Sequence, residues 1–255
     1  MGNITTIGII GLGNAGAPIL NNLNKSNKYK LVAFDIDTKK LNDIPKNIIK
    51  ATSIKNLAEQ CNVVLTCLPK PEHVLEAVDG KDGLLQNASS GMVWIDTSTT
   101  NFKQTKKLAT KASTYGVSML EATLTGGVHA LQNNNMVCLA GGDEVTFKLW
   151  KEVLQDAIGE VVVLCGKVGA GAIAKVVSNM LAFTNMVAAS ECMMIAKKAG
   201  LDLENFFDAI RVSAGNSFAW ETVVPHIFNQ KYESGFTMDL ACKDMNLSYL
   251  LGQDL

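Results

Sequence analysis

A glycine-rich turn near the start of the chain constrains the fold more than any other feature. It reads Gly11-Leu12-Gly13-Asn14-Ala15-Gly16 and lies between a short apolar run, Thr6–Ile10, and a stretch compatible with a helix. In this setting Gly11 permits a tight turn, Gly13 lets the backbone approach a pyrophosphate, and Gly16 lets helix and strand pack closely. The N-terminus of the following helix then faces the anion. The sequence therefore predicts a dinucleotide site that includes Gly11, Leu12, Gly13, Asn14 and Ala15.

An acidic residue beyond the glycines supports this interpretation. Asp35 closes a second strand-like run, Lys30–Phe34, at the distance of about 20 residues where a ribose-binding carboxylate is expected. A carboxylate accepts hydrogen bonds from both ribose hydroxyls but repels a 2′-phosphate, and neither Ile36 nor Asp37 supplies an arginine. We therefore expect NAD rather than NADP. The alternative is a glycine-rich turn in another α/β domain, with Asp35 as a solvated strand-end residue.

Length, charge and cysteine content limit the classes of binding partner and the cellular location that we expect. The 255 residues suit one large or two ordinary domains. A net charge of -1 with scattered lysines leaves no electrostatic footprint for nucleic acid or a membrane surface. Six widely spaced cysteines predict neither disulfides nor a zinc site, but reduced and mostly buried thiols. Because the first strand begins within a few residues of Met1, we expect no targeting segment and a cytoplasmic protein.

Apolar runs alternate with helix-compatible segments along the first two thirds of the chain. The further strand candidates are Val63–Leu68, Met92–Asp96, Val117–Ala122, Met136–Ala140 and Val161–Leu164. Such alternation is typical of an α/β fold with a mostly parallel, doubly wound sheet of the Rossmann type. Ligands bind at the carboxyl edge of such a sheet, so the segments after Leu68 and Asp96 are expected to line the site.

The pattern changes between residues 168 and 200, which contain no proline and many Ala and Met residues. This predicts one long buried helix of about 45 Å that ends at Gly200. Its charge-poor part, Val176–Ser190, is too short and too polar to span a bilayer. Shorter helices are expected from Leu201 onward. We therefore predict a dinucleotide-binding domain over residues 1–166 and a helical substrate and oligomerisation domain over residues 167–255.

Two polar residues on this helix suit chemistry on a carbonyl substrate. Lys175 and Asn179 are four residues apart, so they project from the same helix face. A lysine ammonium can donate a proton to a carbonyl oxygen, while an amide one turn away orients that oxygen. The alternative is an ordinary surface lysine at the start of a helix.

The chain resembles the β-hydroxyacid dehydrogenase family, which includes 3-hydroxyisobutyrate dehydrogenase and tartronate semialdehyde reductase. The resemblance rests on ordered motifs along nearly the whole length, in addition to the glycine turn. These motifs are Leu68-Pro69-Lys70-Pro71, Ile95-Asp96-Thr97-Ser98-Thr99, Glu121-Ala122-Thr123-Leu124-Thr125-Gly126-Gly127, Gly169 to Asn179, and Lys243-Asp244.

The resemblance implies roles for individual residues. Lys175 corresponds to the catalytic lysine and Asn179 to the residue that orients the substrate. The substrate carboxylate would lie at Thr125, Gly126 and Gly127, where a hydroxyl and two N–H groups can surround an anion. Ser98 is assigned to the substrate site as well. The remaining cofactor-side positions are Leu68, Pro69, His73, Thr99 and Lys243.

Three departures from the family pattern bear on activity. The usual D-A-P-V-S-G-G is here E-A-T-L-T-G-G, so Thr125 keeps the hydroxyl but adds a methyl group that narrows the carboxylate pocket. The usual K-x-x-N-N has Ser178 in place of its first asparagine. Relatives continue through further helices beyond the position of Leu255, so we expect either a truncated or an unusually short second domain, with exposed apolar surface.

Other residues compete for these roles. His129 is an alternative general acid, because its ordinary pKa lies near 6.5 and it follows the anion-binding element. Arg211 is an alternative carboxylate clamp, although a solvated charge is the simpler interpretation. Phe218, Trp220 and Phe236 are expected in the core of the helical domain rather than at the cofactor.

The sequence thus predicts an NAD-dependent dehydrogenase that interconverts a small 3-hydroxy acid and its semialdehyde or oxo acid, assembled as a homodimer or homotetramer. One alternative is an imine or other carbonyl reductase, or a decarboxylating relative, on the same scaffold. The other is a catalytically silent dinucleotide-binding module that serves in assembly.

Overall fold

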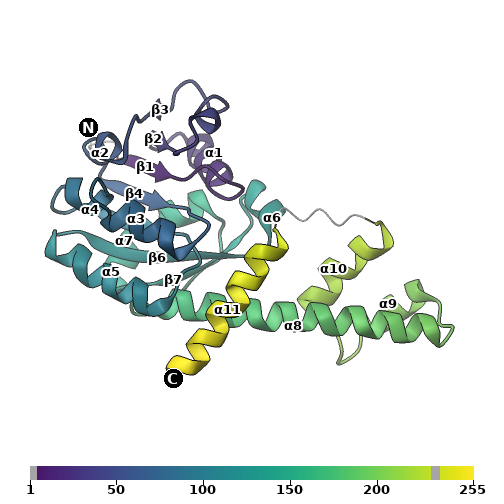
Figure 1. Ribbon diagram of the computed structural model, residues 1–255. Coiled ribbons are helices and arrows are strands. Elements are labelled where there is room, and N and C mark those ends of the chain that lie inside the picture. Colours follow the sequence, from purple (N-terminus) through teal and green to yellow (C-terminus); the bar gives the residue numbers. More distant parts are fainter. Residues whose placement is uncertain (1–4, 231–235) are drawn as a thin grey trace. The chain divides into compact units, whose positions relative to one another are not determined.

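The computed structural model describes residues 5–230 and 236–255, apart from the side chains of residues 128 and 129 (Figure 1). The chain divides into two compact units, one of Met1–Lys175 with Leu251–Leu255 and one of Val176–Leu250. The first unit is an α/β domain and the second is helical, as the sequence predicted.

The first unit is built on an eight-stranded sheet with the order β3-β2-β1-β4-β5-β6-β7-β8. Six of the seven described pairings are parallel, whereas β6 and β7 pair antiparallel. An antiparallel neighbour needs no long crossover, and residues 126–136 suffice to reverse the chain. The strands are β1 Thr6–Ile10, β2 Lys30–Phe34, β3 Ile49–Lys50, β4 Val63–Thr66, β5 Val93–Asp96, β6 Ser118–Thr125, β7 Val137–Gly141 and β8 Val162–Gly166.

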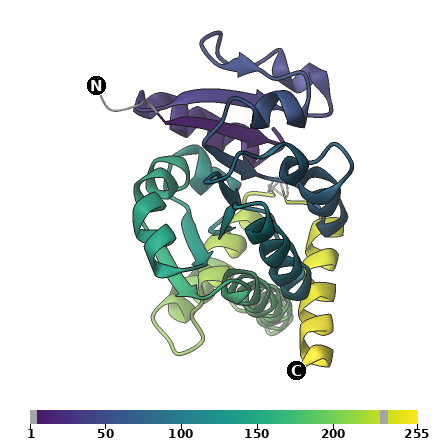
Figure 2. The same ribbon diagram turned by 90° about the vertical axis from the view of Figure 1, so that its left-hand side faces the viewer.

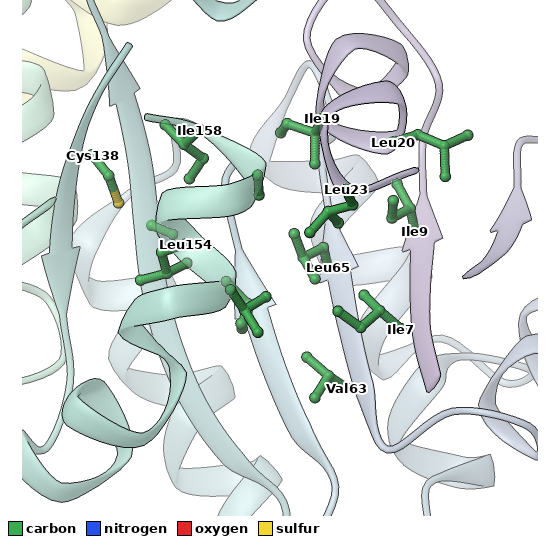
Figure 3. Packing of buried hydrophobic residues seen from close by; sticks show 14 of the residues in the cluster. Ile7, Ile9, Ile19, Leu20, Leu23, Val63, Leu65, Cys138, Leu154 and Ile158 are labelled. Carbon is green, nitrogen blue, oxygen red and sulfur yellow. The ribbon is translucent and has the colours of Figure 1, made fainter. Parts of the chain in front are cut away.

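Helices cover both faces of the sheet, and α5 and α7 lie on opposite sides of it (Figure 2). In Figure 3, Ile19 and Leu23 of α1 face the apolar side chains of β1 and β4. The elements are α1 Gly16–Ser26, η1 Thr38–Leu41, α2 Ile54–Ala58, α3 Pro71–Asp79, α4 Leu84–Asn87, α5 Phe102–Thr114, α6 Val128–Gln132 and α7 Glu144–Ala157. The predicted mostly parallel sheet is confirmed, and only the short edge strand β3 had no sequence signal.

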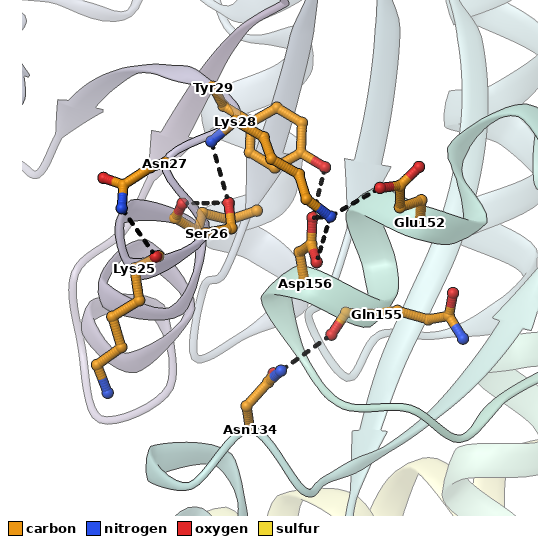
Figure 4. Close-up of polar contacts among 10 residues, drawn as sticks. Lys25, Ser26, Asn27, Lys28, Tyr29, Asn134, Glu152, Gln155 and Asp156 are labelled. Atoms are coloured by element: carbon orange, nitrogen blue, oxygen red, sulfur yellow. Dashed lines mark hydrogen bonds and ion pairs between the residues drawn. The ribbon is translucent and has the colours of Figure 1, made fainter.

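Polar contacts tie the end of α1 to α7 (Figure 4). The ammonium group of Lys28 pairs with Glu152 at 2.7 Å and with Asp156 at 3.0 Å. The Tyr29 hydroxyl donates to the Asp156 carboxylate at 2.7 Å, and burial raises the pKa of Tyr29. Nearby, the buried amide of Asn22 donates to the carbonyl oxygens of Leu131 and Ala157 at 2.9 and 3.1 Å. These contacts fix α1, which carries the end of the glycine turn.

The second unit is organised by α8, Ala170–Lys198, whose first residues belong to the first unit. The predicted long helix is therefore confirmed, and Gly169 and Gly200 flank it at φ of +98° and +80°. The other helices are α9 Leu203–Arg211, α10 Phe218–Phe228 and α11 Met238–Asp254. Trp220 is the centre of a small core, where it packs against Phe206 and Phe207.

Two of the three aromatic residues expected in this core lie elsewhere. Phe218 is 67% exposed and Phe236 is 38% exposed, so the expectation was wrong for both. Phe218 opens α10 directly after its N-cap, Ser217, at the end of the helix rather than on its inner face. Phe236 stacks on Phe183 with ring centroids 5.9 Å apart.

The expectation that α8 is a buried helix was also wrong. A stripe of its apolar side chains is exposed, because they recur at helical spacing on one face that none of the described segments, residues 5–230 and 236–255, covers. The apolar stripe consists of Val177, Met180, Leu181, Val187, Met194 and Ile195. By length and composition α8 also matches a membrane span, a test that core helices of water-soluble proteins pass as well.

The cysteines differ in part from the sequence expectation. All six are free thiols, but Cys165, Cys192 and Cys242 are exposed, whereas Cys61 and Cys138 are buried. The exposed ones lie on β8, α8 and α11, where a small side chain such as cysteine can remain in contact with solvent. The prediction of mostly buried thiols was therefore wrong for half of them.

Candidate functional site

The glycine turn between β1 and α1 has the geometry of a dinucleotide cradle. Gly11 has a φ of +96°, and a Cβ there would lie too close to the Cys67 carbonyl oxygen. A Cβ at Gly16 would overlap the Gly11 carbonyl oxygen, so helix and turn pack without side chains between them. A Cβ at Gly13, by contrast, would meet nothing within 4 Å. The space beside Gly13 is open to a ligand, and the residues present fit a bound pyrophosphate.

Asp35 lies at the end of β2, beside this turn, and is buried. Its carboxylate accepts hydrogen bonds from the backbone N–H groups of Leu12 at 2.7 Å and Asp37 at 2.8 Å. The Lys40 ammonium lies 3.2 Å from the same carboxylate. Asp35 is therefore held in place against the glycine turn. Sequence reasoning did not consider Lys40, which η1 brings back to this carboxylate.

The segments after β4 and β5 meet at the same edge of the sheet. Asp96 is buried, and its Oδ1 accepts from the Thr66 hydroxyl at 2.8 Å and from the Ser98 N–H at 3.1 Å. The Ser98 hydroxyl in turn accepts from the Leu68 N–H at 3.0 Å. Ser98 is 4% exposed, and its assignment to the substrate stays a prediction. Pro69 is exposed and Thr99 is half-buried at this edge.

Burial raises the pKa of Asp96 to about 6, against the lowering effect of its hydrogen bonds with Ser98 and Thr66. Asp96 and Glu121 are register partners on the neighbouring strands β5 and β6. Both were missed as site residues by sequence reasoning. Each is a carboxylate in an otherwise apolar strand sequence. Because a buried carboxylate needs hydrogen-bond partners, this pattern could have marked both residues as candidates.

Thr125 is the last residue of β6, and Gly126 and Gly127 follow it, where the sequence predicts an anion-binding turn. Gly126 and Gly127 have φ of +125° and +89° and are exposed, and Thr125 is half-buried. A Cβ at Gly127 would meet nothing within 4 Å. The side chain of His129, the alternative general acid, lies outside the described part of the structure.

The start of α8 is fastened to β6. Glu121 Oε2 accepts from the Gly169 N–H at 2.5 Å, and its Oε1 accepts from the Ala172 N–H at 2.8 Å. The Thr123 hydroxyl donates to the carbonyl oxygens of Leu139 and Gly171. Lys175 follows on the next turn of α8 and is half-buried. The catalytic candidate thus lies one turn beyond a buried attachment point.

A second group of polar residues joins α8 and α11 within the second unit. Asn179 is 7% exposed, and its Nδ2 donates to Asp244 Oδ2 at 2.7 Å. The Lys243 ammonium pairs with Asp244 Oδ1 at 2.9 Å. The Ser248 hydroxyl donates to the carbonyl oxygen of Val176 at 2.9 Å. The structure therefore brings the predicted Asn179 and Lys243 together through Asp244, which was not predicted as a site residue.

Two further candidates are exposed. His73 lies in the first turn of α3 and is exposed. Arg211, the alternative carboxylate clamp, ends α9, lies 3.5 Å from Asp208 and covers the ring of Phe207 at 5.6 Å. Its side chain is 50% exposed, in keeping with a solvated charge.

Two family models match the chain along nearly its whole length. Residues 6–166 match the NAD-binding domain of 6-phosphogluconate dehydrogenase. Residues 169–255 match the NAD-binding domain of NADP-dependent 3-hydroxyisobutyrate dehydrogenase. The predicted boundary between residues 166 and 167 falls between these two matches. The boundary between the two compact units lies later, between Lys175 and Val176.

Individual relatives are similar to the chain in sequence, and one of them in structure. Mitochondrial 3-hydroxyisobutyrate dehydrogenase of Homo sapiens is 31% identical over 254 residues, which cover 96% of this chain and 74% of the relative. The 2-(hydroxymethyl)glutarate dehydrogenase of Eubacterium barkeri is 29% identical over 250 residues, covering 97% and 82%. The structure of Mycobacterium tuberculosis 3-hydroxyisobutyrate dehydrogenase with L-serine has a TM-score of 0.90 at 28% identity, covering 98% of this chain and 87% of that one.

Proposed function

Because the chain belongs to the β-hydroxyacid dehydrogenase family, we propose that it interconverts a small 3-hydroxy acid and its semialdehyde or oxo acid with NAD as the hydride carrier. The family makes it an oxidoreductase that uses a nicotinamide dinucleotide. The observation that supports the more specific proposal is the attachment of α8, which carries Lys175, to β6, which leads into Gly126 and Gly127.

The preference for NAD is supported by Asp35. Its carboxylate is buried and held by Leu12 and Asp37 beside the glycine turn, and a carboxylate at this position disfavours a 2′-phosphate on the ribose. Lys40 offsets part of this charge and therefore reduces the repulsion without providing the planar fork of an arginine. We expect discrimination against NADP to be moderate rather than absolute.

The proposed chemistry assigns one task to each polar group. When bound, the nicotinamide supplies or accepts the hydride. Lys175 donates a proton to the carbonyl oxygen during reduction and takes it back from the hydroxyl during oxidation. The side chain of Asn179 projects from the same face of α8, one turn after Lys175, and orients that oxygen. Lys243 is assigned to the nicotinamide end by the family resemblance.

The substrate class is supported by the turn after β6. Glu121, Thr123 and Thr125 alternate along β6, so they share one strand face. The first two hold the start of α8, and the third begins the proposed carboxylate-binding turn. The shared strand face supports a substrate carboxylate near the Lys175 helix. The relative bound to L-serine, itself a small 3-hydroxy acid, is in keeping with this class. The methyl group of Thr125 favours the smaller members.

A spectrophotometric screen tests class, cofactor and substrate together. The panel contains 3-hydroxyisobutyrate, glycerate, L-serine and 4-hydroxybutyrate, each with NAD and with NADP. We expect turnover with a 3-hydroxy acid and a preference for NAD, which Asp35→Ala erodes. Lys175→Ala should abolish steady-state turnover and leave only a slow reaction that single-turnover measurements detect, while NADH binding, followed by fluorescence, is retained. Lys197→Ala changes an exposed lysine near the end of the same helix and serves as the matched control.

Other outcomes identify the alternatives. Reduction of cyclic imines without oxidation of any hydroxy acid would favour an imine reductase. Tight NADH binding with no turnover across the panel would favour a silent interaction module. A preference for NADP would contradict the role given to Asp35.

We also propose a homodimer or homotetramer of a cytoplasmic protein. The apolar stripe on α8 exposes six large apolar side chains along one face of a 29-residue helix. Exposed apolar side chains that recur along one helix face favour association with another protein surface. Light scattering after size exclusion measures the mass in solution. Met194→Glu within the stripe should reduce it, and a monomeric wild type would contradict the assembly.

A further inference from the structure

A buried carboxylate at the start of α8 has no part in the chemistry proposed above. Glu121 is 2% exposed and accepts hydrogen bonds from the backbone N–H groups of Gly169 at 2.5 Å and Ala172 at 2.8 Å. N–H groups in the first turn of a helix have no partner within the helix. An anion at this end also interacts favourably with the helix dipole. Glu121 thus joins the middle of β6 to the first turn of α8.

The surrounding backbone leaves just enough room for this carboxylate. A Cβ at Gly141 would overlap Glu121 Oε2, and a Cβ at Gly171 would lie 3.0 Å from the Glu121 Cβ. Gly169 has a φ of +98°, which a residue with a side chain rarely adopts. Two glycines, Gly141 and Gly171, therefore leave room for one side chain, and the contact is built into the fold rather than made on a surface.

Helical geometry connects this contact to the catalytic candidate. Lys175 lies four residues beyond Gly171 and three beyond Ala172. Its side chain therefore projects from the same face of α8 as these residues, about 5.4 Å farther along the helix axis. A helix turns by about 100° per residue. A small rotation or slide of the first turn therefore displaces the Lys175 ammonium directly. The Thr123 hydroxyl donates to the Gly171 carbonyl oxygen at 3.2 Å. Side chains of β6 therefore bind both N–H groups and a carbonyl oxygen in the first turn of α8.

We propose that Glu121 is the positioning residue for Lys175: by binding the Gly169 and Ala172 N–H groups it sets the rotation and the height of α8 at which the ammonium reaches the substrate oxygen. Glu121 touches neither substrate nor cofactor in this arrangement. The inference rests on the proposed function, since it concerns the same proton transfer. It assigns a task to a residue at which the chain departs from the aspartate usual in the family.

A double-mutant cycle tests the proposal. Glu121→Gln keeps one oxygen acceptor but turns an NH2 group toward a backbone N–H donor, so only one of the two bonds is retained. We expect kcat to fall between about 10- and 100-fold, because small displacements of reacting groups have effects of this size. The KM for the cofactor should stay within about twofold. In a Lys175→Ala background, measured in single turnovers with enzyme in excess, Glu121→Gln should cause no further loss.

Two additional variants separate positioning from general damage. Asp143 caps α7, with its Oδ1 accepting from the Thr146 N–H at 2.8 Å, so Asp143→Ala removes a helix cap in the same unit and should leave kcat unchanged. Glu121→Asp keeps both acceptor oxygens on a shorter side chain and should restore part of the lost kcat. If Glu121→Gln fails to fold, this milder variant replaces it in the cycle.

Hydrogen exchange of residues 169–172 reports on the contact without any turnover. Glu121→Gln should accelerate exchange at Gly169 and Ala172, whereas Asp143→Ala should not. Equal losses in the Lys175 and Lys175→Ala backgrounds, or an unchanged kcat with unchanged exchange, would overturn the inference. Failure of the proposed function would appear differently, as a wild-type protein that turns over no hydroxy acid.

Discussion

The side-chain amide of Asn179 donates a hydrogen bond of 2.7 Å to the carboxylate of Asp244, and both residues are buried. An ionised carboxylate only accepts hydrogen bonds, so the NH2 group of Asn179 must face Asp244. Its carbonyl oxygen is thereby turned to the other side of the amide. Asp244 also pairs with Lys243 at 2.9 Å, so one carboxylate orders two of the predicted site residues.

Replacing this amide by a carboxylate should make stability depend on pH. In Asn179→Asp two buried carboxyl groups face each other and share one proton, which raises the pKa of the pair in the folded state. The proton is held below that pKa, so stability is present in acid and lost as pH rises. We expect a loss of about 2 kcal/mol or more at pH 8, which urea unfolding at pH 5 and pH 8 measures.

The control for this prediction is the exchanged pair. Asn179→Asp combined with Asp244→Asn restores one donor and one carboxylate and should recover most of the stability at pH 8. Ser248→Ala removes a neighbouring hydrogen bond to Val176 without introducing charge, so its effect should be the same at both pH values. An unchanged pH profile in Asn179→Asp would show that the two side chains do not face each other.

Two glycines of the turn should respond to alanine in opposite ways. A Cβ at Gly16 would overlap the Gly11 carbonyl oxygen, so Gly16→Ala should destabilise the fold by about 1–3 kcal/mol. A Cβ at Gly13 meets nothing within 4 Å, so Gly13→Ala should keep the wild-type Tm. It should nevertheless weaken NADH binding about tenfold or more, because the methyl group occupies the approach of the pyrophosphate. A Gly13→Ala protein that binds NADH normally would place the cofactor elsewhere.

The buried amide of Asn22 should matter far more than its neighbour on α1. Asn22→Ala leaves the carbonyl oxygens of Leu131 and Ala157 without their donor, at a cost of about 2–3 kcal/mol. Asn21 is exposed on the same helix, and Asn21→Ala should change stability by less than about 0.5 kcal/mol. Chemical denaturation of the two variants compares them directly. Equal effects would mean that the Asn22 bonds contribute little.

The sequence was most informative where local chemistry and fold coincide. The glycine turn and the runs ending at Ile10 and Phe34 predicted β1 and β2 with the observed bounds, because turn glycines and buried parallel strands have strong local signatures. The long helix was predicted for the same reason. Contacts between distant segments have no such signature. Asp244 meets Asn179 across 65 positions, and Glu121 meets Gly169 across 48, so neither contact follows from spacing along the chain.

The errors have one physical origin. Residues such as Phe218 and those of the apolar stripe on α8 were expected inside because large apolar side chains usually are. In a chain considered alone, the helical unit has too little volume to bury all of them, and Trp220 with its neighbours fills its small core. Hydrophobicity predicts that a side chain is buried somewhere, but it does not tell a core from an interface.

The buried carboxyl of Asp96 should make the whole fold sensitive to pH. Burial raises its pKa from 3.8 to about 6, so between these values the folded state holds a proton that the unfolded chain has released. The free energy of unfolding therefore falls as pH rises through this range, by up to about 3 kcal/mol. Asp96→Asn keeps an acceptor for Thr66 and Ser98 but cannot ionise. Relative to this variant, the wild type should lose stability between pH 4 and pH 7.

Asp143 provides a control of opposite sign for this measurement. Its hydrogen bonds with Thr146 lower its pKa, so its contribution is present above the ordinary value and lost as pH falls through the lowered one. Relative to Asp143→Asn, the wild type should therefore gain stability as pH rises from acid. Urea unfolding of the three proteins from pH 2.5 to pH 7.5 gives both differences, because the Asp143 difference develops below its ordinary pKa and the Asp96 difference above it. Parallel curves for wild type and Asp96→Asn would show that Asp96 is already ionised in acid, and that Thr66 and Ser98 hold a charge rather than a neutral acid.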